Sequence, residues 1–100
     1  MIRHTVVFTC KPNTPQQSIL DAIEMAQKVL PGITGVLSFS MGKDLGLQPG
    51  KSGDLAVVAD FDSIKDVEAY LSDPVHLDYI KTSLSSIIET RISVQFEVGT

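Results

Sequence analysis

The sequence predicts a single α+β domain in which a four-stranded antiparallel sheet carries helices on one face. Four segments alternate apolar and polar residues with the period of two that is typical of strands. Two segments between them place apolar residues at helical spacing. The chain of 100 residues has the length of one ordinary domain, so we expect residues 1–100 to form one unit.

A strand over residues 2–10 and a helix after it are expected first. One face of this strand carries Ile2, His4, Val6, Phe8 and Cys10. Thr14 is the expected N-cap of the helix, with Pro15 at the first helical position and Gln17 completing a capping box. The helix then presents an apolar stripe that consists of Ile19, Leu20, Ala22, Ile23, Ala26 and Leu30. Pro31 and Gly32 end it.

Two strands separated by a long loop are expected next. The first covers residues 36–41, with Leu37, Phe39 and Met41 on one face. The glycine-rich loop 42–53 is expected to be mobile, and Asp44 with nearby carbonyls could hold a cation. The strand at residues 55–61 directs one apolar row to the core, made of Leu55, Val57, Ala59 and Phe61.

A helix that is broken by a proline and a final strand complete the chain. Asp62 or Ser63 is expected to cap the helix, whose buried stripe would be Ile64, Val67 and Leu71. Pro74 forces a break, because its ring clashes with the preceding turn. A second helical piece would follow, with Leu77, Ile80 and Leu84 inward and Tyr79 outward. Residues 88–98 alternate as a strand with one apolar face.

The predicted order β-α-β-β-α-β is that of the ferredoxin-like fold, in which both helices cover one face of the sheet. The other face would carry apolar side chains that a monomer leaves in water, namely Val7, Val36, Ala56 and Val58. Because an apolar patch of this kind usually marks an interface, we expect a homodimer.

Composition and charge exclude several classes of function. The net charge of −4 and the lack of a Lys/Arg cluster argue against nucleic acid and membrane surfaces as partners. No apolar run is long enough to span a bilayer, and the alternating N-terminal segment does not resemble a signal peptide. Cys10 is the only cysteine, so no intramolecular disulfide is possible. A cytoplasmic location is the simplest expectation.

The segment 70–80 contains the best candidates for chemistry. His76 lies just beyond Pro74, and Tyr70 lies one helical piece before it. If His4 faces the helices, it would meet His76 in a cleft suited to a small organic ligand. A neutral His76 could abstract a proton next to a carbonyl, and Tyr70 could stabilise the enolate oxygen. In the structural alternative, His76 braces the proline break, while Tyr70 and His4 are core residues with satisfied polar groups.

Apart from the cation that the loop 42–53 could hold, no metal and no cofactor is expected from the sequence. Its two histidines are far apart and no cysteine pair accompanies them, so no zinc pattern is present. The segment Gly42–Gly46 lacks the spacing of a phosphate-binding loop.

Three segments resemble the stress-responsive dimeric α/β barrel (A/B barrel) family. They are residues 1–8, residues 54–61 and, most specifically, Tyr-Leu-Ser-Asp-Pro-Val-His at residues 70–76. The resemblance covers essentially the whole chain and implies a homodimer whose two sheets meet as a β-barrel with the helices outside. The family includes a plant polyketide cyclase whose base matches His76, with an assisting tyrosine at Tyr70 and a pocket histidine at His4. A further pocket histidine of that cyclase falls on Leu55 here.

The resemblance implies binding of a small, largely apolar carbonyl compound, with aldol or proton-transfer chemistry by His76 and Tyr70. We expect His4, Phe8, Leu55 and Val57 to contact that compound. Two alternatives remain open. One is a non-catalytic stress-response or assembly protein, and the other is an enzyme like the cofactor-free monooxygenases that share the dimeric barrel.

Overall fold

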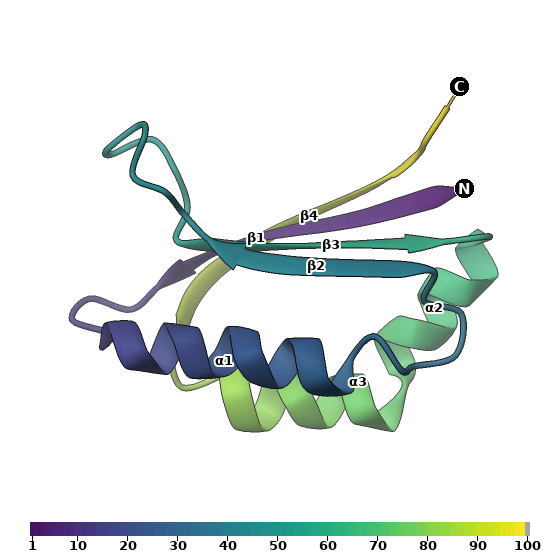
Figure 1. Ribbon diagram of the computed structural model, residues 1–100, viewed down its shortest axis with the longest axis horizontal. Helices are drawn as coiled ribbons and strands as arrows, with labels where there is room; N and C mark the ends of the chain where they lie inside the picture. Colours follow the sequence, from purple (N-terminus) through teal and green to yellow (C-terminus); the bar gives the residue numbers. More distant parts are fainter. Residues whose placement is uncertain (100) are drawn as a thin grey trace.

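The computed structural model describes residues 1–99, which form one antiparallel sheet with helices on one side (Figure 1). The strands pair in the order β2-β3-β1-β4, so β3 and β1 are central and β2 and β4 are edges. This is the ferredoxin-like fold that the sequence predicts. The elements in chain order are β1 (Ile2–Cys10), α1 (Gln16–Val29), β2 (Ser38–Lys43), β3 (Leu55–Phe61), α2 (Ile64–Ser72), α3 (Pro74–Tyr79), a π-helical turn η1 (Ile80–Leu84) and β4 (Ile88–Glu97).

The strand register determines which side chains face the helices. Val6 of β1 lies opposite Val57 of β3 and opposite Ser93 of β4. Directly opposed residues in an antiparallel pair point to the same face. The helix-facing side therefore combines a buried apolar row on β1 and β3 with a polar row on β4. The inward row predicted for β3 is buried along its whole length, as expected for Leu55, Val57, Ala59 and Phe61.

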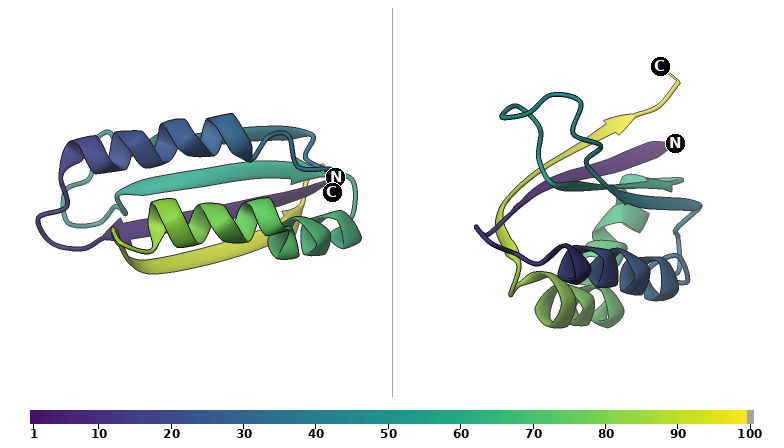
Figure 2. Two further views of the ribbon diagram at one scale, coloured as in Figure 1. Left: turned by 90° about the horizontal axis from the view of Figure 1, so that it is seen from below. Right: turned by 60° about the vertical axis from the view of Figure 1, so that its left-hand side comes forward.

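The opposite face of the sheet has no helix over it (Figure 2). Four large apolar side chains are exposed there, namely Val7 (46%), Ile92 (72%), Val94 (54%) and Phe96 (46%). Ala56 and Val58, which were predicted on this face, are half-buried on β3. Val36 was also predicted here, but this was wrong: Val36 precedes β2 and packs against the hydrophobic core.

The start of α1 differs from the prediction. The helix begins at Gln16, its N-cap is Pro15, and no side chain caps it. The Thr14 hydroxyl instead donates to the Lys11 carbonyl, and the Thr14 amide does so as well, closing a turn before the helix. The Gln17 side chain bonds to Asp21. The predicted capping box is therefore wrong, because the threonine hydroxyl is used by the preceding turn.

The proline break lies where the sequence places it. Ser63 caps α2, and Asp73 both ends α2 and caps α3 through a bond from the Val75 amide to its carboxylate. The predicted inner faces need correction, because Ile64 and Leu77 are exposed whereas Tyr79 is buried. The π-helical turn then adds a residue to the helical repeat, through a bond from the Ser85 amide to the Ile80 carbonyl.

The predicted second strand and loop are shifted by two residues. β2 begins at Ser38 and includes Gly42 and Lys43. The loop that follows is tied at its base by bonds from the Asp44 amide to the Asp54 carbonyl and from the Asp54 amide to the Phe8 carbonyl. Among residues 1–99, no three His, Cys, Asp or Glu side chains are grouped to hold a metal ion, and no helix could cross a membrane.

Candidate functional site

A cavity of about 160 Å³ lies between the helix-facing side of the sheet and the helix layer. Its wall is mostly apolar, with a small number of polar side chains. The residues that line it are His4, Val6, Phe8, Leu30, Met41, Val57, Tyr70, His76, Tyr79, Ile80, Leu84, Ser85, Ile88 and Arg91. An apolar hollow with a few converging polar groups is the usual form of a small-molecule site.

His76 is held at the cavity by the proline break. It lies in the first turn of α3, and its Nδ1 is 3.2 Å from the carbonyl oxygen of Leu71 at the end of α2. A carbonyl oxygen only accepts hydrogen bonds, so Nδ1 carries the proton and Nε2 keeps a free lone pair. Burial lowers the pKa of His76, Arg91 lowers it further, and the bond to Leu71 and the charge of Asp73 partly oppose this. The imidazole is therefore neutral near pH 7.

Tyr70 lies beside His76, with ring centroids 4.6 Å apart. Its side chain is packed against Phe61 and is only 1% exposed, and burial raises the pKa of Tyr70 to about 12. Its hydroxyl has no hydrogen-bond partner among residues 1–99. Since no enclosed polar side-chain atom in this part of the chain lacks a partner, the hydroxyl must open onto the cavity. A protonated phenol that lacks an acceptor is a preformed site for a ligand oxygen.

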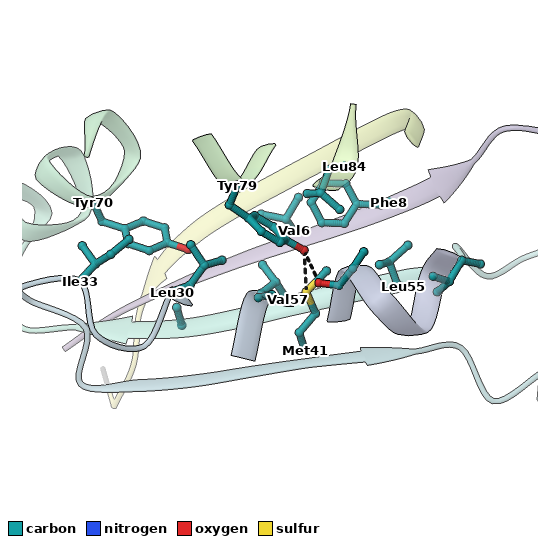
Figure 3. Packing of buried hydrophobic residues seen from close by; sticks show 14 of the residues in the cluster. Val6, Phe8, Leu30, Ile33, Met41, Leu55, Val57, Tyr70, Tyr79 and Leu84 are labelled. Atoms are coloured by element: carbon teal, nitrogen blue, oxygen red, sulfur yellow. Dashed lines mark hydrogen bonds between the residues drawn. The ribbon is translucent and has the colours of Figure 1, made fainter. Parts of the chain in front are cut away.

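Tyr79 shows the contrasting arrangement. Its hydroxyl donates to the Ala22 carbonyl of α1 at 2.7 Å and lies 3.8 Å from the Met41 sulfur (Figure 3). This bond ties α3 to α1 across the helix layer. The prediction that Tyr79 faces outward is wrong, because the tyrosine ring fills the space between α1 and the sheet.

His4 completes a row of three rings. It is buried on β1, and its ring centroid is 6.1 Å from that of Tyr70 in an edge-on arrangement. The Gln95 side-chain nitrogen on β4 lies 2.8 Å from His4 Nδ1. With the amide nitrogen donating, Nε2 of His4 carries the proton. Burial lowers the pKa of His4, and the charges of His76 and Arg91 act in the same direction.

The structure brings most of the predicted site residues together. His4, Phe8, Val57, Tyr70 and His76 all line the cavity. Leu55 does not line it and is buried in the core nearby. Sequence reasoning missed Tyr79, whose role depends on a contact with α1, and Arg91. Arg91 could have been found, because antiparallel pairing places it opposite Phe8 and hence on the helix-facing side.

This arrangement combines a neutral imidazole with a phenol whose hydroxyl has no hydrogen-bond partner in residues 1–99, inside a mostly apolar wall. The imidazole can accept a proton, and the phenol can donate a hydrogen bond to an oxygen that gains negative charge. The mostly apolar wall lowers the local dielectric constant, which strengthens both interactions.

Fold and cavity define a ferredoxin-like α+β domain with a histidine–tyrosine pair under its helix layer. Residues 2–98 match the model of the Stress responsive A/B Barrel Domain, and the chain belongs to this family. No curated protein matches it.

Solved structures agree with this assignment. A dimeric ferredoxin-like protein of unknown function from Thermobifida fusca YX is 29% identical with a TM-score of 0.87, covering 97% of this chain and 90% of that one. A protein of the same family from Mesorhizobium loti is 23% identical with a TM-score of 0.81 and coverages of 96% and 94%. A hydroxynitrile lyase from Passiflora edulis is 21% identical with a TM-score of 0.73 and coverages of 95% and 90%. The last two likenesses concern the fold.

Proposed function

We propose that this protein is a homodimer formed through the uncovered face of its sheet. The exposed side chains Val7, Ile92, Val94 and Phe96 supply the apolar surface for this contact. The polar end of the same face is already paired, because Arg3 makes two bonds to Asp60, at 2.8 and 3.0 Å, and Ser38 donates to Asp60 as well. Burial against a partner would leave no lone charge there. The dimeric state of the Thermobifida fusca relative supports the proposal.

We further propose that the cavity binds a small, largely apolar carbonyl compound and catalyses proton transfer at the carbon next to the carbonyl. The observation that carries this proposal is the Tyr70 hydroxyl, which has no partner among residues 1–99 although the residue is only 1% exposed and its ring lies beside that of His76. A carbonyl oxygen of a ligand could accept a hydrogen bond from this hydroxyl. The cavity of about 160 Å³ fits one ring or a short chain, since a hollow of roughly 150 Å³ accommodates benzene.

In the proposed reaction, Nε2 of His76 takes the proton from the carbon next to the carbonyl. The negative charge moves to the oxygen, where the Tyr70 hydroxyl donates a hydrogen bond. The Leu71 carbonyl accepts from Nδ1–H throughout and stabilises the imidazolium that forms. The enolate then either regains a proton or attacks a second carbonyl, which is the aldol closure implied by the family's polyketide cyclase. The hydroxynitrile lyase supports a catalytic role only in that its fold is shared with an enzyme.

The test is exchange of the methyl protons of acetophenone in D2O, followed by proton NMR. The wild-type protein should accelerate this exchange. His76→Gln should lower the exchange rate by at least about 100-fold, because glutamine can still donate to the Leu71 carbonyl but cannot accept the proton from the substrate carbon. Tyr70→Phe should reduce the rate by about 100-fold. Asp78→Asn, an exposed change in the same helix, is the control and should keep the wild-type rate.

Each outcome bears on one of the candidate functions. Equal rates with wild-type protein and His76→Gln would contradict the proposed chemistry. Binding of acetophenone without exchange would favour a non-catalytic carrier. Consumption of dioxygen with an oxidised product, in place of exchange, would favour the monooxygenase-like alternative.

A further inference from the structure

Arg91 is a cation at the rim of the cavity. It lies on β4 opposite Phe8, which directs it toward the helices, and it belongs to the cavity wall while its side chain remains exposed to solvent. The face proposed for the dimer contact is the opposite one, so dimerisation leaves Arg91 accessible.

No carboxylate of the described residues 1–99 forms an ion pair with Arg91. Within residues 1–99 its side chain takes part in no ion pair or hydrogen bond. The part of the cavity wall that the structure describes contains no Asp or Glu. A second cation is close to the same rim, since the Lys11 ammonium lies 3.5 Å from the carbonyl oxygen of Ser85, which also lines the cavity. In a chain with a net charge of −4, this rim is a local positive site.

The polar groups of the cavity are arranged from the rim inward. The Arg91 guanidinium is at the solvent edge, whereas Tyr70 and His76 lie deeper and are only 1% and 8% exposed. A guanidinium is always charged and binds carboxylate in a two-point geometry. A ligand that matches this order has an apolar body, a carbonyl oxygen that reaches inward and an anionic group that stays at the rim.

We propose that the ligand of this cavity is an anionic carbonyl compound, whose carboxylate or other acidic group is bound by Arg91. This inference rests on the proposed function and extends it from carbonyl compounds in general to acidic ones. Arg91 is thus a specificity-determining residue that touches the ligand outside the reacting atoms.

The test compares two probes of similar shape, benzoylformate and its methyl ester, of which only the first carries a negative charge. Both carry the same aryl ketone. Dissociation constants are measured by calorimetry for the wild-type protein, Arg91→Gln, Arg91→Lys and the control Lys81→Gln, which removes an exposed charge elsewhere. Wild-type protein should bind benzoylformate at least about tenfold more tightly than the ester, a difference of about 1.4 kcal/mol. Higher salt should reduce this preference.

The variants should separate charge from shape. Arg91→Gln should abolish the preference by weakening the binding of benzoylformate. Arg91→Lys should retain part of the preference, and Lys81→Gln should retain all of it. If the ester binds but wild-type protein shows no preference, or if Arg91→Gln keeps the preference, the role of Arg91 is refuted and the proposed function stands. If neither probe binds, both proposals are refuted.

Discussion

Tyr70 and Tyr79 line the same cavity, and within the described part of the chain only Tyr79 has a hydrogen-bond partner for its hydroxyl. The two phenols lie on neighbouring helical pieces and are both nearly inaccessible to solvent. We therefore regard Tyr79 as a structural tyrosine and Tyr70 as one whose hydroxyl is available to a ligand.

This difference predicts opposite effects on stability. Tyr79→Phe removes the bond to the Ala22 carbonyl and should lower the free energy of unfolding by about 1 kcal/mol. Tyr70→Phe removes a hydroxyl that bonds to no residue in the range 1–99, so stability should stay the same or rise slightly. Urea denaturation of both variants measures the two effects. A larger loss for Tyr70→Phe would mean that its hydroxyl has a structural partner.

Adjacent valines on β3 provide a test of the cavity. Val57 faces the cavity, whereas Val58 points to the uncovered side of the sheet. Val57→Ile adds a methyl group to an existing hollow, so it should leave stability equal or raise it by up to about 1 kcal/mol and weaken acetophenone binding. Val58→Ile is the matched control and should leave that binding unchanged. Thermal unfolding and an NMR titration with acetophenone measure these effects.

If Val57→Ile lowers stability by more than about 1 kcal/mol, the site is already filled and the cavity is closed in solution.

If the dimer forms through the uncovered face of the sheet, a charged substitution on that face should disrupt it. Ile92→Lys places a charge in the centre of the exposed apolar patch, next to Val7, and should convert the dimer into a monomer. Ile64→Lys changes an equally apolar and exposed residue on α2, in the helix layer, and should preserve the dimer. Light scattering coupled to size-exclusion chromatography gives the mass of each. A wild-type monomer, or an Ile92→Lys dimer, would contradict the proposed contact.

The two histidines predict a pH dependence. Burial lowers the pKa of both His4 and His76 below the usual 6.5, and the charge of Arg91 acts in the same direction on both. His76 also lowers the pKa of His4, whereas the bond to the Leu71 carbonyl and the charge of Asp73 partly oppose the shift of His76. Below about pH 6.5 the unfolded chain therefore binds more protons than the folded one. The contribution of these histidines to stability is complete above that pH and is lost as pH falls through their folded pKa values.

NMR titration of the ring protons should place both pKa values below 6.5, and urea denaturation at about pH 5 should give a smaller free energy of unfolding than at about pH 7.5. The rate of acetophenone exchange should rise with pH through the pKa of His76. A pKa of His76 above 6.5 would contradict the assignment of His76 as a base that is neutral near pH 7.

The sequence was sufficient where local pattern determines structure. The alternation at residues 2–10 and 55–61, and the break at Pro74, each have a local physical cause, and the structure agrees with them. It also indicated that His4 and His76 would meet, because strand parity and the helix after Pro74 direct both inward, whereas Tyr70 was assigned from the family resemblance. Their proximity is observed, and their roles remain proposals.

The remaining features depend on contacts between distant segments. The Tyr79 hydroxyl finds its partner 57 residues earlier, at Ala22, and no local pattern reveals this bond. The π-helical turn at Ile80–Leu84 inserts a residue between Leu84 and the helix before it. Counting back from Leu84 at ordinary helical spacing therefore placed Leu77 on the inner side, which was wrong. Thr14 matched a capping pattern but bonds to Lys11, since two local structures compete for the same hydroxyl.

The most direct test is the infrared spectrum of acetophenone labelled with carbon-13 at its carbonyl and bound to the protein. If the Tyr70 hydroxyl donates to the ligand oxygen, the carbonyl band should lie at lower frequency than in hexane. It should return toward the hexane position in Tyr70→Phe and keep its bound position in Tyr79→Phe. An identical band in wild-type protein and Tyr70→Phe would contradict the assignment of Tyr70 as the hydrogen-bond donor to the carbonyl.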